Sequence, residues 1–327
     1  MEAGSSLALF RAPGRVNLIG EHTDYAGGLV LPVAIDRALV VSGARAEEVL
    51  RLSSDRFPGT VALRLDERGD VEGWGRYVAG VASQLAELGR PPVGFSGHVS
   101  GNLPAGAGLG SSAALEVAVA TALCAVAGFA LPALELAEAC RRAEERAVGV
   151  PCGIMDQAAS LLGRAGHALL LDCATLDYRY VPLPEAISLL VVESGIERRL
   201  SEAPYAQRGL ELEAGHPRRV RHVESENERV RELVDALERD DRGMLALLFA
   251  ASRASLRDDF EVSTPRLDLL VERALAAGAF AARLTGAGFG GSVLALADAD
   301  QASDVAARLA DVYAVHRCSS ADGARDL

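Results

Sequence analysis

Apolar residues in the first half of the chain form short blocks separated by glycine, proline and charged residues. Blocks of strand length predict strands at Leu29–Ile35, Ala38–Ala44, Val61–Leu65, Gly94–Ser100, Ala168–Asp172, Tyr178–Pro182 and Ile187–Glu193. Longer stretches predict helices at Trp74–Leu88, Ser112–Val126, Ala133–Val148 and Ile154–Leu162. The pattern therefore predicts a domain that mixes strands and helices.

The remainder of the chain is mainly helical. Helices are predicted at Pro204–Glu213, Arg219–Arg239, Met244–Ala254 and Pro265–Ala277, and strands at Ala281–Leu284, Val293–Ala297 and Val312–His316. The charged run from Arg218 to Arg242 is typical of a solvated helix face. The change in pattern predicts two domains, residues 1–180 and 181–327, and a cleft between domains is where a small ligand usually binds.

Composition narrows the class of protein. With 50% apolar residues the chain can bury a large core, yet no apolar run reaches the roughly 18 residues of a membrane span. Residues Met1–Arg11 lack the basic and apolar regions of a signal peptide, so we expect a cytoplasmic protein. A net charge of −12 argues against nucleic acid as a partner. No motif indicates a membrane or an obligate protein partner.

The basic residues and the cysteines exclude several kinds of site. All 33 basic residues are arginines, so the chain has neither the lysine of a Walker-type phosphate loop nor the strand lysine of a protein kinase. The five cysteines are scattered and form no CxxC pair, which argues against a disulfide framework and against a zinc site. We expect them to be buried thiols.

The segment Arg11–Tyr25 places polar groups of both charges next to residues that break helices. Its polar members include Arg15, Asn17, Glu21, His22 and Asp24. A polar surface turn is the simplest interpretation of such a loop. The density of hydrogen-bonding groups instead favours a polyhydroxylated ligand, because every buried hydroxyl needs a partner.

A glycine-rich segment, Leu103–Glu116, joins a predicted strand to a predicted helix, with glycine at 106, 108 and 110. Glycine lets the backbone approach a bulky anion, and the helix N-terminus offers free N–H groups. The junction therefore predicts a phosphate-binding loop. Ser111 and Ser112 could also cap the helix, a role compatible with contact to phosphate or Mg²⁺.

A second glycine-rich segment, Leu284–Ser292, matches the GxGxxG pattern of dinucleotide-binding proteins. That fingerprint requires a helix after the glycines, whereas the apolar run that begins at Ser292 predicts a strand. The sequence therefore does not favour a nicotinamide cofactor. We expect a tight loop that packs against the phosphate-binding loop.

Together the three segments resemble the motifs of the galactokinases within the GHMP small-molecule kinase superfamily, in the same order and over almost the whole chain. Gly14–Tyr25 is similar to the signature of galactokinases themselves, whereas the glycine loops mark the superfamily. Further similarity lies at Cys152–Gln157, Ser194–Tyr205, Arg208, His222, Glu226–Asn227 and Ser255–Asp259. The resemblance implies an α+β fold: a mixed-sheet N-terminal domain, a ferredoxin-like C-terminal domain and a site between them.

The resemblance also implies an activity, transfer of the γ-phosphate of Mg-ATP to the 1-hydroxyl of galactose, and roles by position. Asp156 and Arg15 match the catalytic pair. Sugar contacts fall on Glu21, His22, Thr23, Asp24, Gly153 and Tyr205. The phosphate loop falls on Gly106, Ala107, Gly108, Leu109, Gly110, Ser111 and Ser112, and the aromatic residues beside adenine on Trp74 and Tyr77. The Mg²⁺ ligands fall on Ser112 and Glu144.

The residues alone leave two of these assignments open. Asp156 lies on a small-residue face of a predicted helix, where a ligand could approach, but an aspartate stabilised by the helix dipole explains the position equally well. Glu144 lies within Arg141–Arg146, a pattern typical of an exposed helix end with ion pairs. Only the resemblance assigns Glu144 to a metal.

Two rival functions remain. One is a sister kinase for arabinose, N-acetylgalactosamine or a uronic acid, and the other is a non-catalytic sensor of galactose and ATP. Gly110 and Ala26 stand where galactokinases often have serine and asparagine, which leaves the sugar preference open. A sensor is expected to have a damaged phosphate loop or catalytic pair, and both are intact in this sequence.

Overall fold

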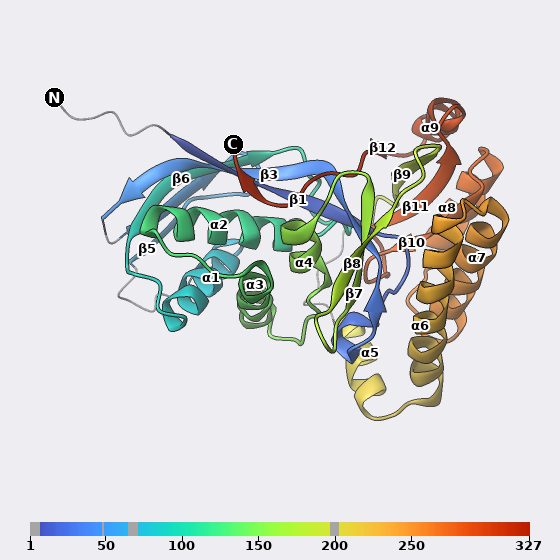
Figure 1. Ribbon diagram of the computed structural model, residues 1–327, viewed down its shortest axis with the longest axis horizontal. Coiled ribbons are helices and arrows are strands. Elements are labelled where there is room, and N and C mark those ends of the chain that lie inside the picture. The colour runs from blue at the N-terminus through green and yellow to red at the C-terminus, as the bar shows by residue number, and fades with distance from the viewer. Residues whose placement is uncertain (1–6, 48, 65–70, 197–202) are drawn as a thin grey trace.

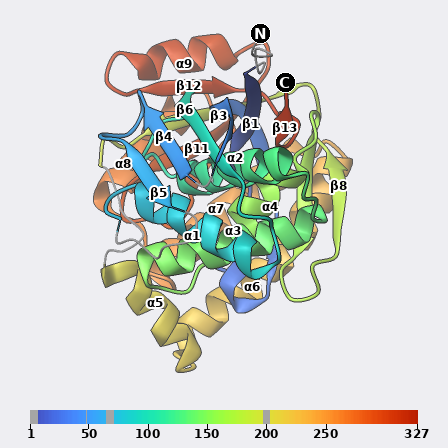
Figure 2. The same ribbon diagram turned by 90° about the vertical axis from the view of Figure 1, so that its left-hand side faces the viewer.

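The computed structural model describes residues 7–47, 49–64, 71–196 and 203–327. Two halves lie side by side, a sheet with helices α1–α4 at one end and a bundle of α6–α8 at the other (Figure 1). Figure 2, turned by 90°, shows α5 and α9 at opposite ends of the molecule, as Figure 1 does. The architecture is α+β, as the family resemblance implies.

A six-stranded sheet forms the N-terminal half, in the order β13-β1-β3-β6-β4-β5. Its strands are β1 (Ala8–Asn17), β3 (Pro32–Ala46), β4 (Val49–Ser54), β5 (Val61–Arg64), β6 (Gly94–Gly101) and β13 (Arg325–Asp326). The sheet is mixed because β4 and β6 run parallel whereas the other neighbours are antiparallel.

Four helices accompany this sheet: α1 (Gly75–Glu87), α2 (Ser111–Ala127) and α4 (Met155–Leu162) contact its strands, and α3 (Ala133–Val148) packs against the other three helices. Helix α2 contacts β1 and β3 on one side and α1, α3 and α4 on the others. It is apolar around most of its circumference because it is surrounded, as expected for a central helix. A small sheet of β2 (Leu29–Val30), β7 (His167–Asp172) and β8 (Tyr178–Pro182) lies beside α4.

The C-terminal half is built on a four-stranded antiparallel sheet, in the order β10-β11-β9-β12. Its strands are β9 (Ile187–Glu193), β10 (Ala281–Thr285), β11 (Ser292–Asp298) and β12 (Val315–Cys318). Helices α5 (Ala203–Glu213), α6 (Pro217–Glu238), α7 (Arg242–Asp258) and α8 (Pro265–Ala276) connect β9 to β10, and α9 (Ala302–Ala310) connects β11 to β12. This order is the βαββαβ topology of a ferredoxin-like domain, so the predicted fold class is confirmed.

The two halves share buried surface. One apolar cluster contains Val16 of β1 together with Leu233 of α6 and Phe249 of α7. The chain also returns at its end to the first sheet, where β13 pairs with β1 at Phe10. The domain boundary near residue 180 stays a prediction.

Several elements differ from the sequence prediction. Two predicted strands, Leu29–Ile35 and Ala38–Ala44, are largely one strand, β3, that continues through Asp36 and Arg37. Strands β1, β4 and β13 and helix α9 were not predicted. Strand β1 contains Pro13 and Gly14, which interrupt its apolar pattern, and its register with β3 shifts beside Gly14. Of the predicted strand Val61–Leu65, the last residue lies outside the described residues, as do residues 197–202 of the similar segment Ser194–Tyr205.

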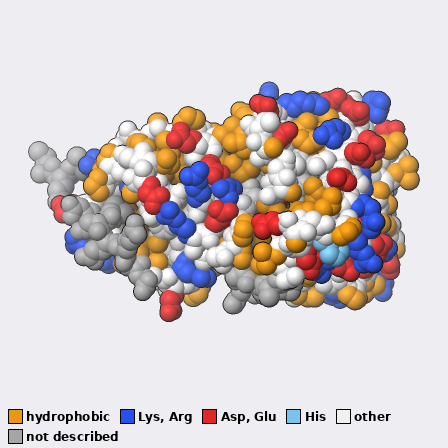
Figure 3. Space-filling view, turned by 90° about the horizontal axis from the view of Figure 1, so that it is seen from below, with side chains coloured by type: hydrophobic (Ala, Val, Ile, Leu, Met, Phe, Trp, Pro, Cys, Tyr) orange, Lys and Arg blue, Asp and Glu red, His pale blue; other side chains and the backbone are white. Residues whose placement is uncertain are grey.

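The expectation of a solvated face at 218–242 is wrong for part of α6. Arg219, His222 and Glu226 are buried there. The expected buried thiols are found at four of the five cysteines, and Cys173 is partly exposed. Arginines and acidic side chains are interspersed on the face drawn in Figure 3. Among the described residues, no helix is long and apolar enough to span a membrane.

Candidate functional site

A cavity of about 440 Å³ lies where the two halves meet, and all three sequence segments contribute to its wall. The predicted site residues on the wall are Arg15, Glu21, His22, Asp24, Trp74, Tyr77, Gly106, Gly108, Leu109, Gly110, Ser111, Ser112, Glu144, Gly153, Asp156 and Tyr205. Thr23 and Ala107 do not line it. The structure therefore brings together residues that are far apart in the chain, from Arg15 to Ala287.

Asp156 and Arg15 form a bidentate ion pair in this wall. Arg15 Nε donates to Asp156 Oδ1 at 2.8 Å, and Arg15 Nη2 donates to Oδ2 at 2.6 Å. Arg15 Nη1 also donates to the carbonyl of Gly108 at 2.6 Å. Asp156 lies in the first turn of α4, so the dipole of that helix adds to the favourable surroundings of its carboxylate. The pair thus links the carboxylate to the glycine-rich loop.

The loop before α2 has the geometry of an anion site. Gly106, Gly108 and Gly110 have φ of 73°, 77° and 73°, a left-handed backbone that glycine adopts at little cost. Gly110 is the N-cap of α2, and no side chain caps the helix, so neither Ser111 nor Ser112 serves as the cap. The N–H groups of the first helical turn therefore remain available beside the cavity, where they can bind phosphate.

The second glycine-rich segment packs against this loop, as predicted. Ser292 Oγ donates to the carbonyl of Ala107 at 2.7 Å, which explains why Ala107 is turned away from the cavity. The segment is followed by strand β11 rather than by a helix. Gly286 and Ala287 line the cavity, so this segment shapes the site. Because a strand and not a helix follows the glycines, the segment is not a dinucleotide-binding fingerprint.

Glu144 is buried beside the phosphate loop, so the expectation of an exposed helix end is wrong for this residue. Ser112 Oγ donates to Glu144 Oε1 at 2.6 Å. Burial, followed by the neighbouring charge of Asp156, raises the pKa of Glu144, whereas the hydrogen bond from Ser112 lowers it. The expected ion pairs form on the outer side of α3, where Arg141 binds Glu138 and Glu145.

Gln157 binds Glu144 and a second buried carboxylate, Glu116, and sequence reasoning gave neither Gln157 nor Glu116 a role. Gln157 Nε2 donates to Glu144 Oε2 at 2.8 Å and to Glu116 Oε2 at 3.0 Å. Glu116 is fully buried, and desolvation together with the charge of Glu144 raises its pKa well above the usual range. The available signal was Glu116 itself, the only charged residue in the predicted apolar helix Ser112–Val126.

The segment of residues 21–25 forms another part of the wall. His22 Nε2 lies 3.2 Å from the carbonyl of Ala287, and Nδ1 lies 2.9 Å from the Tyr25 hydroxyl. A carbonyl only accepts, so the neutral ring carries its proton on Nε2 and accepts at Nδ1. The ring of Tyr205 lies 5.9 Å from that of His22 and 6.0 Å from that of Tyr25. These groups form a wall with apolar faces and polar edges.

Asp24 and Gly153 fit closely together in this wall. A Cβ atom at Gly153 would lie 1.8 Å from Asp24 Oδ2, so only glycine fits there. Burial, followed by the charge of Asp156, raises the pKa of Asp24 to about 7. Thr23 is fully buried with its hydroxyl 2.8 Å from the carbonyl of Gly20 and 2.7 Å from that of Leu29. Its hydroxyl therefore supports the loop and is not directed to the cavity.

The opposite end of the cavity is aromatic. Trp74 stacks on Phe57 with ring centroids 5.5 Å apart, and its Nε1 donates to the carbonyl of Pro58 at 2.9 Å. Tyr77, one turn along α1 from this pair, also lines the cavity. Phe57 was not predicted, because its segment has no recognisable pattern before the fold brings it to Trp74.

Comparison with family models and known proteins agrees with this arrangement. Residues 2–45 match the galactokinase galactose-binding signature, residues 76–164 the N-terminal domain of GHMP kinases and residues 233–315 their C-terminal domain. A galactokinase of Thermococcus kodakarensis is 39% identical over 92% of this chain and 93% of that protein. A galactokinase of Streptomyces coelicolor is 40% identical over 94% of this chain and 88% of that protein.

Solved structures show the same similarity. Galactokinase of Lactococcus lactis, in complex with galactose, superposes with a TM-score of 0.92 at 31% identity, covering 99% of this chain and 96% of that chain. Mevalonate kinase of Methanococcus jannaschii superposes with a TM-score of 0.77 at 21% identity, covering 98% of this chain and 100% of that chain. At that identity the second likeness shows the fold alone.

Proposed function

This chain belongs to the galactokinase family of the GHMP kinases, and on that premise we propose that its central cavity transfers the γ-phosphate of ATP to galactose. One observation carries the proposal: the Arg15–Asp156 pair lies in the same cavity wall as the phosphate loop and the polar segment of residues 21–25. A kinase needs a phosphate cradle, a group that orients the acceptor hydroxyl and a positive charge near the transferred group. The cavity supplies all three.

We assign the acceptor to the 1-hydroxyl of galactose, giving galactose 1-phosphate. Asp156 would orient this hydroxyl and accept its proton, because its carboxylate lies on the cavity wall. Arg15 would balance the charge of the carboxylate and, through its bond to Gly108, hold it at a set distance from the phosphate loop. Phosphoryl transfer depends mainly on positioning and charge stabilisation, and this pair provides both.

We assign the divalent cation of the reaction to Ser112 and Glu144. The two oxygen-bearing side chains meet on the cavity wall, and Mg²⁺ typically takes one or two protein oxygens while keeping water and phosphate ligands. Among the described residues no group of three or more His, Cys, Asp or Glu side chains could hold a metal, so a sparse ligand set that ATP completes fits this chain. When bound, Mg²⁺ supplies positive charge to the β- and γ-phosphates.

We assign sugar recognition to Asp24, His22, Glu21, Gly153 and Tyr205, and the adenine end to Trp74, Tyr77 and Phe57. Galactose and glucose differ only in the direction of the 4-hydroxyl. A site that hydrogen-bonds this group leaves a buried partner unsatisfied when the other epimer binds. Discrimination between the two sugars should therefore be large.

The assignment is tested by a coupled assay of ATP turnover with D-galactose, glucose, arabinose, N-acetylgalactosamine and galacturonic acid. We expect galactose to be the best substrate, with kcat/KM for glucose lower by at least roughly two orders of magnitude. NMR of the product should place phosphate on carbon 1.

The other results have separate meanings. Equal turnover of glucose, or phosphate on another carbon, would contradict the assignment to galactose. A higher kcat/KM for arabinose, N-acetylgalactosamine or galacturonic acid would indicate the sister kinase. Binding of galactose and ATP without turnover would indicate the non-catalytic sensor.

A further inference from the structure

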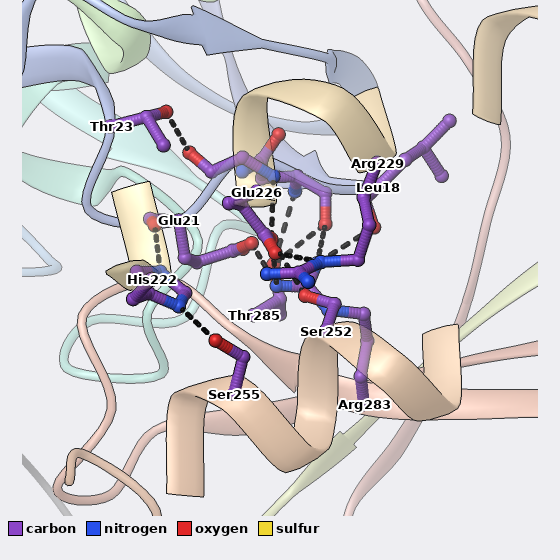
Figure 4. Close-up of polar contacts among 12 residues, drawn as sticks. Leu18, Glu21, Thr23, His222, Glu226, Arg229, Ser252, Ser255, Arg283 and Thr285 are labelled. Atoms are coloured by element: carbon purple, nitrogen blue, oxygen red, sulfur yellow. Dashed lines mark hydrogen bonds and ion pairs between the residues drawn. The ribbon is translucent and has the colours of Figure 1, made fainter. Parts of the chain in front are cut away.

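A buried polar network surrounds Glu21, the residue that precedes His22 in the chain (Figure 4). At its centre is Arg283 of β10, whose side chain is fully buried. Arg283 Nη1 donates to the carbonyl of Leu18 at 2.7 Å, and Nη2 donates to the carboxylate of Glu21. An arginine of the C-terminal half thus holds the backbone and a side chain of the N-terminal motif at the same time.

The carboxylate of Glu21 is held at both oxygens. Oε2 accepts from Arg283, and Oε1 accepts from the backbone N–H of Gly286 at 3.1 Å. His222 Nε2 lies 3.0 Å from the carbonyl oxygen of Glu21, and because a carbonyl only accepts, this ring nitrogen is the donor. The N–H of Gly286 and the ring of His222 belong to the C-terminal half, as Arg283 does, so that half determines where Glu21 lies.

The residue before Glu21 is held in the same way. Gly20 N–H donates to Glu226 Oε1 at 3.1 Å. Glu226 of α6 is fully buried. Its Oε1 accepts from Ser252 Oγ of α7 at 2.6 Å, and its Oε2 accepts from Arg229 Nε at 2.7 Å. Arg283 Nη2 lies 3.8 Å from the same Oε1. The network therefore contains two carboxylates, Glu21 and Glu226, and two guanidinium groups, Arg229 and Arg283, whose charges balance.

The turn before the cavity wall contains two residues with a left-handed backbone conformation. Gly20 has a φ of 99° and His22 a φ of 63°, and a left-handed conformation is unfavourable for a residue with a side chain. The network binds residues 17, 18, 20 and 21, which lie just before His22 and Asp24 in the chain. The network thus holds the turn in the conformation that directs these two side chains.

A network of this kind is poorly explained by stability alone. Replacing a buried ion pair with apolar residues is often neutral or stabilising, because desolvation of the charges offsets their attraction. The phosphate loop has separate anchors, Arg15 on Gly108 and Ser292 on Ala107, which do not belong to the network. The network therefore contacts the sugar side of the cavity directly, and it reaches the phosphate loop only through the segment that contains Gly286 and Ser292.

We propose that Arg283 is a positioning residue for the sugar subsite, which acts through Leu18 and Glu21 to place His22 and Asp24. This inference rests on the proposed function, since it takes the segment of residues 21–25 to be the sugar subsite. Its consequence is a selective one: loss of Arg283 weakens recognition of galactose and leaves recognition of Mg-ATP intact.

Two variants test the proposal. Arg283→Lys keeps the charge but loses the planar fork that reaches Leu18 and Glu21 together. Arg283→Met combined with Glu226→Gln removes one charge of each sign, so that the net charge of the network is unchanged while Glu21 loses its guanidinium partner. In both we expect kcat/KM for galactose to fall roughly 10²-fold, mainly through KM, because a misplacement of about 1 Å has an effect of that size. The KM for Mg-ATP should stay at the wild-type value.

Arg90→Met is the matched control. Arg90 is also a buried arginine that binds backbone carbonyls, those of Leu123 and Val93, but it lies outside the cavity wall and the network. We expect this variant to lower the Tm and to leave both KM values unchanged. Dissociation constants for galactose and for Mg-ATP, measured by calorimetry, should follow the same split in each protein.

The inference is overturned if folded Arg283→Lys binds galactose as tightly as the wild type, or if its affinities for galactose and Mg-ATP fall together. Arg283→Lys alone carries the test if the double variant does not fold. A wild-type protein that phosphorylates a different sugar would contradict the galactose assignment only, and the same comparison would then be made with that sugar.

Discussion

Asp156 and Arg15 form the residue pair to which we assign the reaction centre. In the sequence they are 141 positions apart, and in the fold both oxygens of the carboxylate accept from one guanidinium. Sequence reasoning left open whether Asp156 only stabilises a helix start. Its place on the cavity wall, with Arg15 linked to the phosphate loop, favours a role in catalysis.

Replacing Asp156 should therefore affect turnover more than binding. In Asp156→Asn we expect kcat to fall roughly 10²-fold or more, as for loss of a positioned base, while galactose and Mg-ATP still bind. Steady-state kinetics and calorimetry on the purified variant measure the two effects. Asp258→Asn is the control, because Asp258 is exposed, forms an ion pair with its neighbour Arg257 and does not line the cavity. Near-normal turnover of Asp156→Asn would refute the assignment.

Asp24 should make the stability of the protein depend on pH. Its pKa is raised from 3.8 to about 7 in the native state, first by burial and then by Asp156. Between these pH values the native state holds a proton that the unfolded state has released, so the free energy of unfolding falls as pH rises. We expect Asp24→Asn to lose this dependence, and its Tm to improve relative to wild type from pH 4 to pH 8. Parallel Tm curves for the two proteins would contradict the raised pKa.

At the scale of elements, the site depends on how closely the turn before α4 approaches the 3-10 helix Asp24–Ala26. Glycine at position 153 permits this approach, since any Cβ there would overlap the carboxylate of Asp24. The short distance also places Asp24 near Asp156, which contributes to its raised pKa. The geometry of the cavity around Asp24 therefore depends on glycine at position 153.

A methyl group at this turn should displace Asp24. In Gly153→Ala we expect KM for galactose to rise at least roughly tenfold, with KM for Mg-ATP unchanged, because a displacement of about 1 Å is enough for such a loss. Gly209→Ala is the matched control: Gly209 lies within α5, and a Cβ there would have no neighbour within 4 Å. The control should gain about 0.5–1 kcal/mol of stability from better helix propensity, with both KM values unchanged. Equal KM values for the two variants would refute the close fit.

At the scale of the whole molecule, the proposed function has both ligands bind in a cavity between halves that share a core, so binding and folding should be linked. A ligand that binds only the native state stabilises it by RT ln(1 + [L]/Kd), about 2.7 kcal/mol at 100 times its Kd. We expect galactose and Mg-ATP each to raise the Tm. In Glu144→Ala the rise with Mg-ATP should shrink while the rise with galactose stays. If activity depended on Mg²⁺ concentration in the same way in the wild type and in Glu144→Ala, Glu144 would have only a structural role.

The sequence by itself determined most of the element types and the three segments that form the cavity. Glycine spacing, helix starts and dense polar turns are local features, because they reflect backbone conformations that neighbouring residues impose. For this reason the strand-to-helix junction that contains Gly106–Ser112 and the strand after Ser292 were both predicted correctly, whereas phosphate binding by this junction stays a prediction. The motif of residues 14–25 was recognisable for the same reason.

Only the tertiary structure decided which polar residues are buried and what they bind. Glu144 and Arg141 belong to one helix, yet packing of α3 against α2 buries the first and leaves the second in ion pairs on the outer side. Arg283, Glu226 and Gln157 acquire their partners only when segments far apart in the chain meet. An unpaired charge is costly to bury, so burial of these side chains depends on a partner in place, and a partner many residues away leaves no local pattern in the sequence.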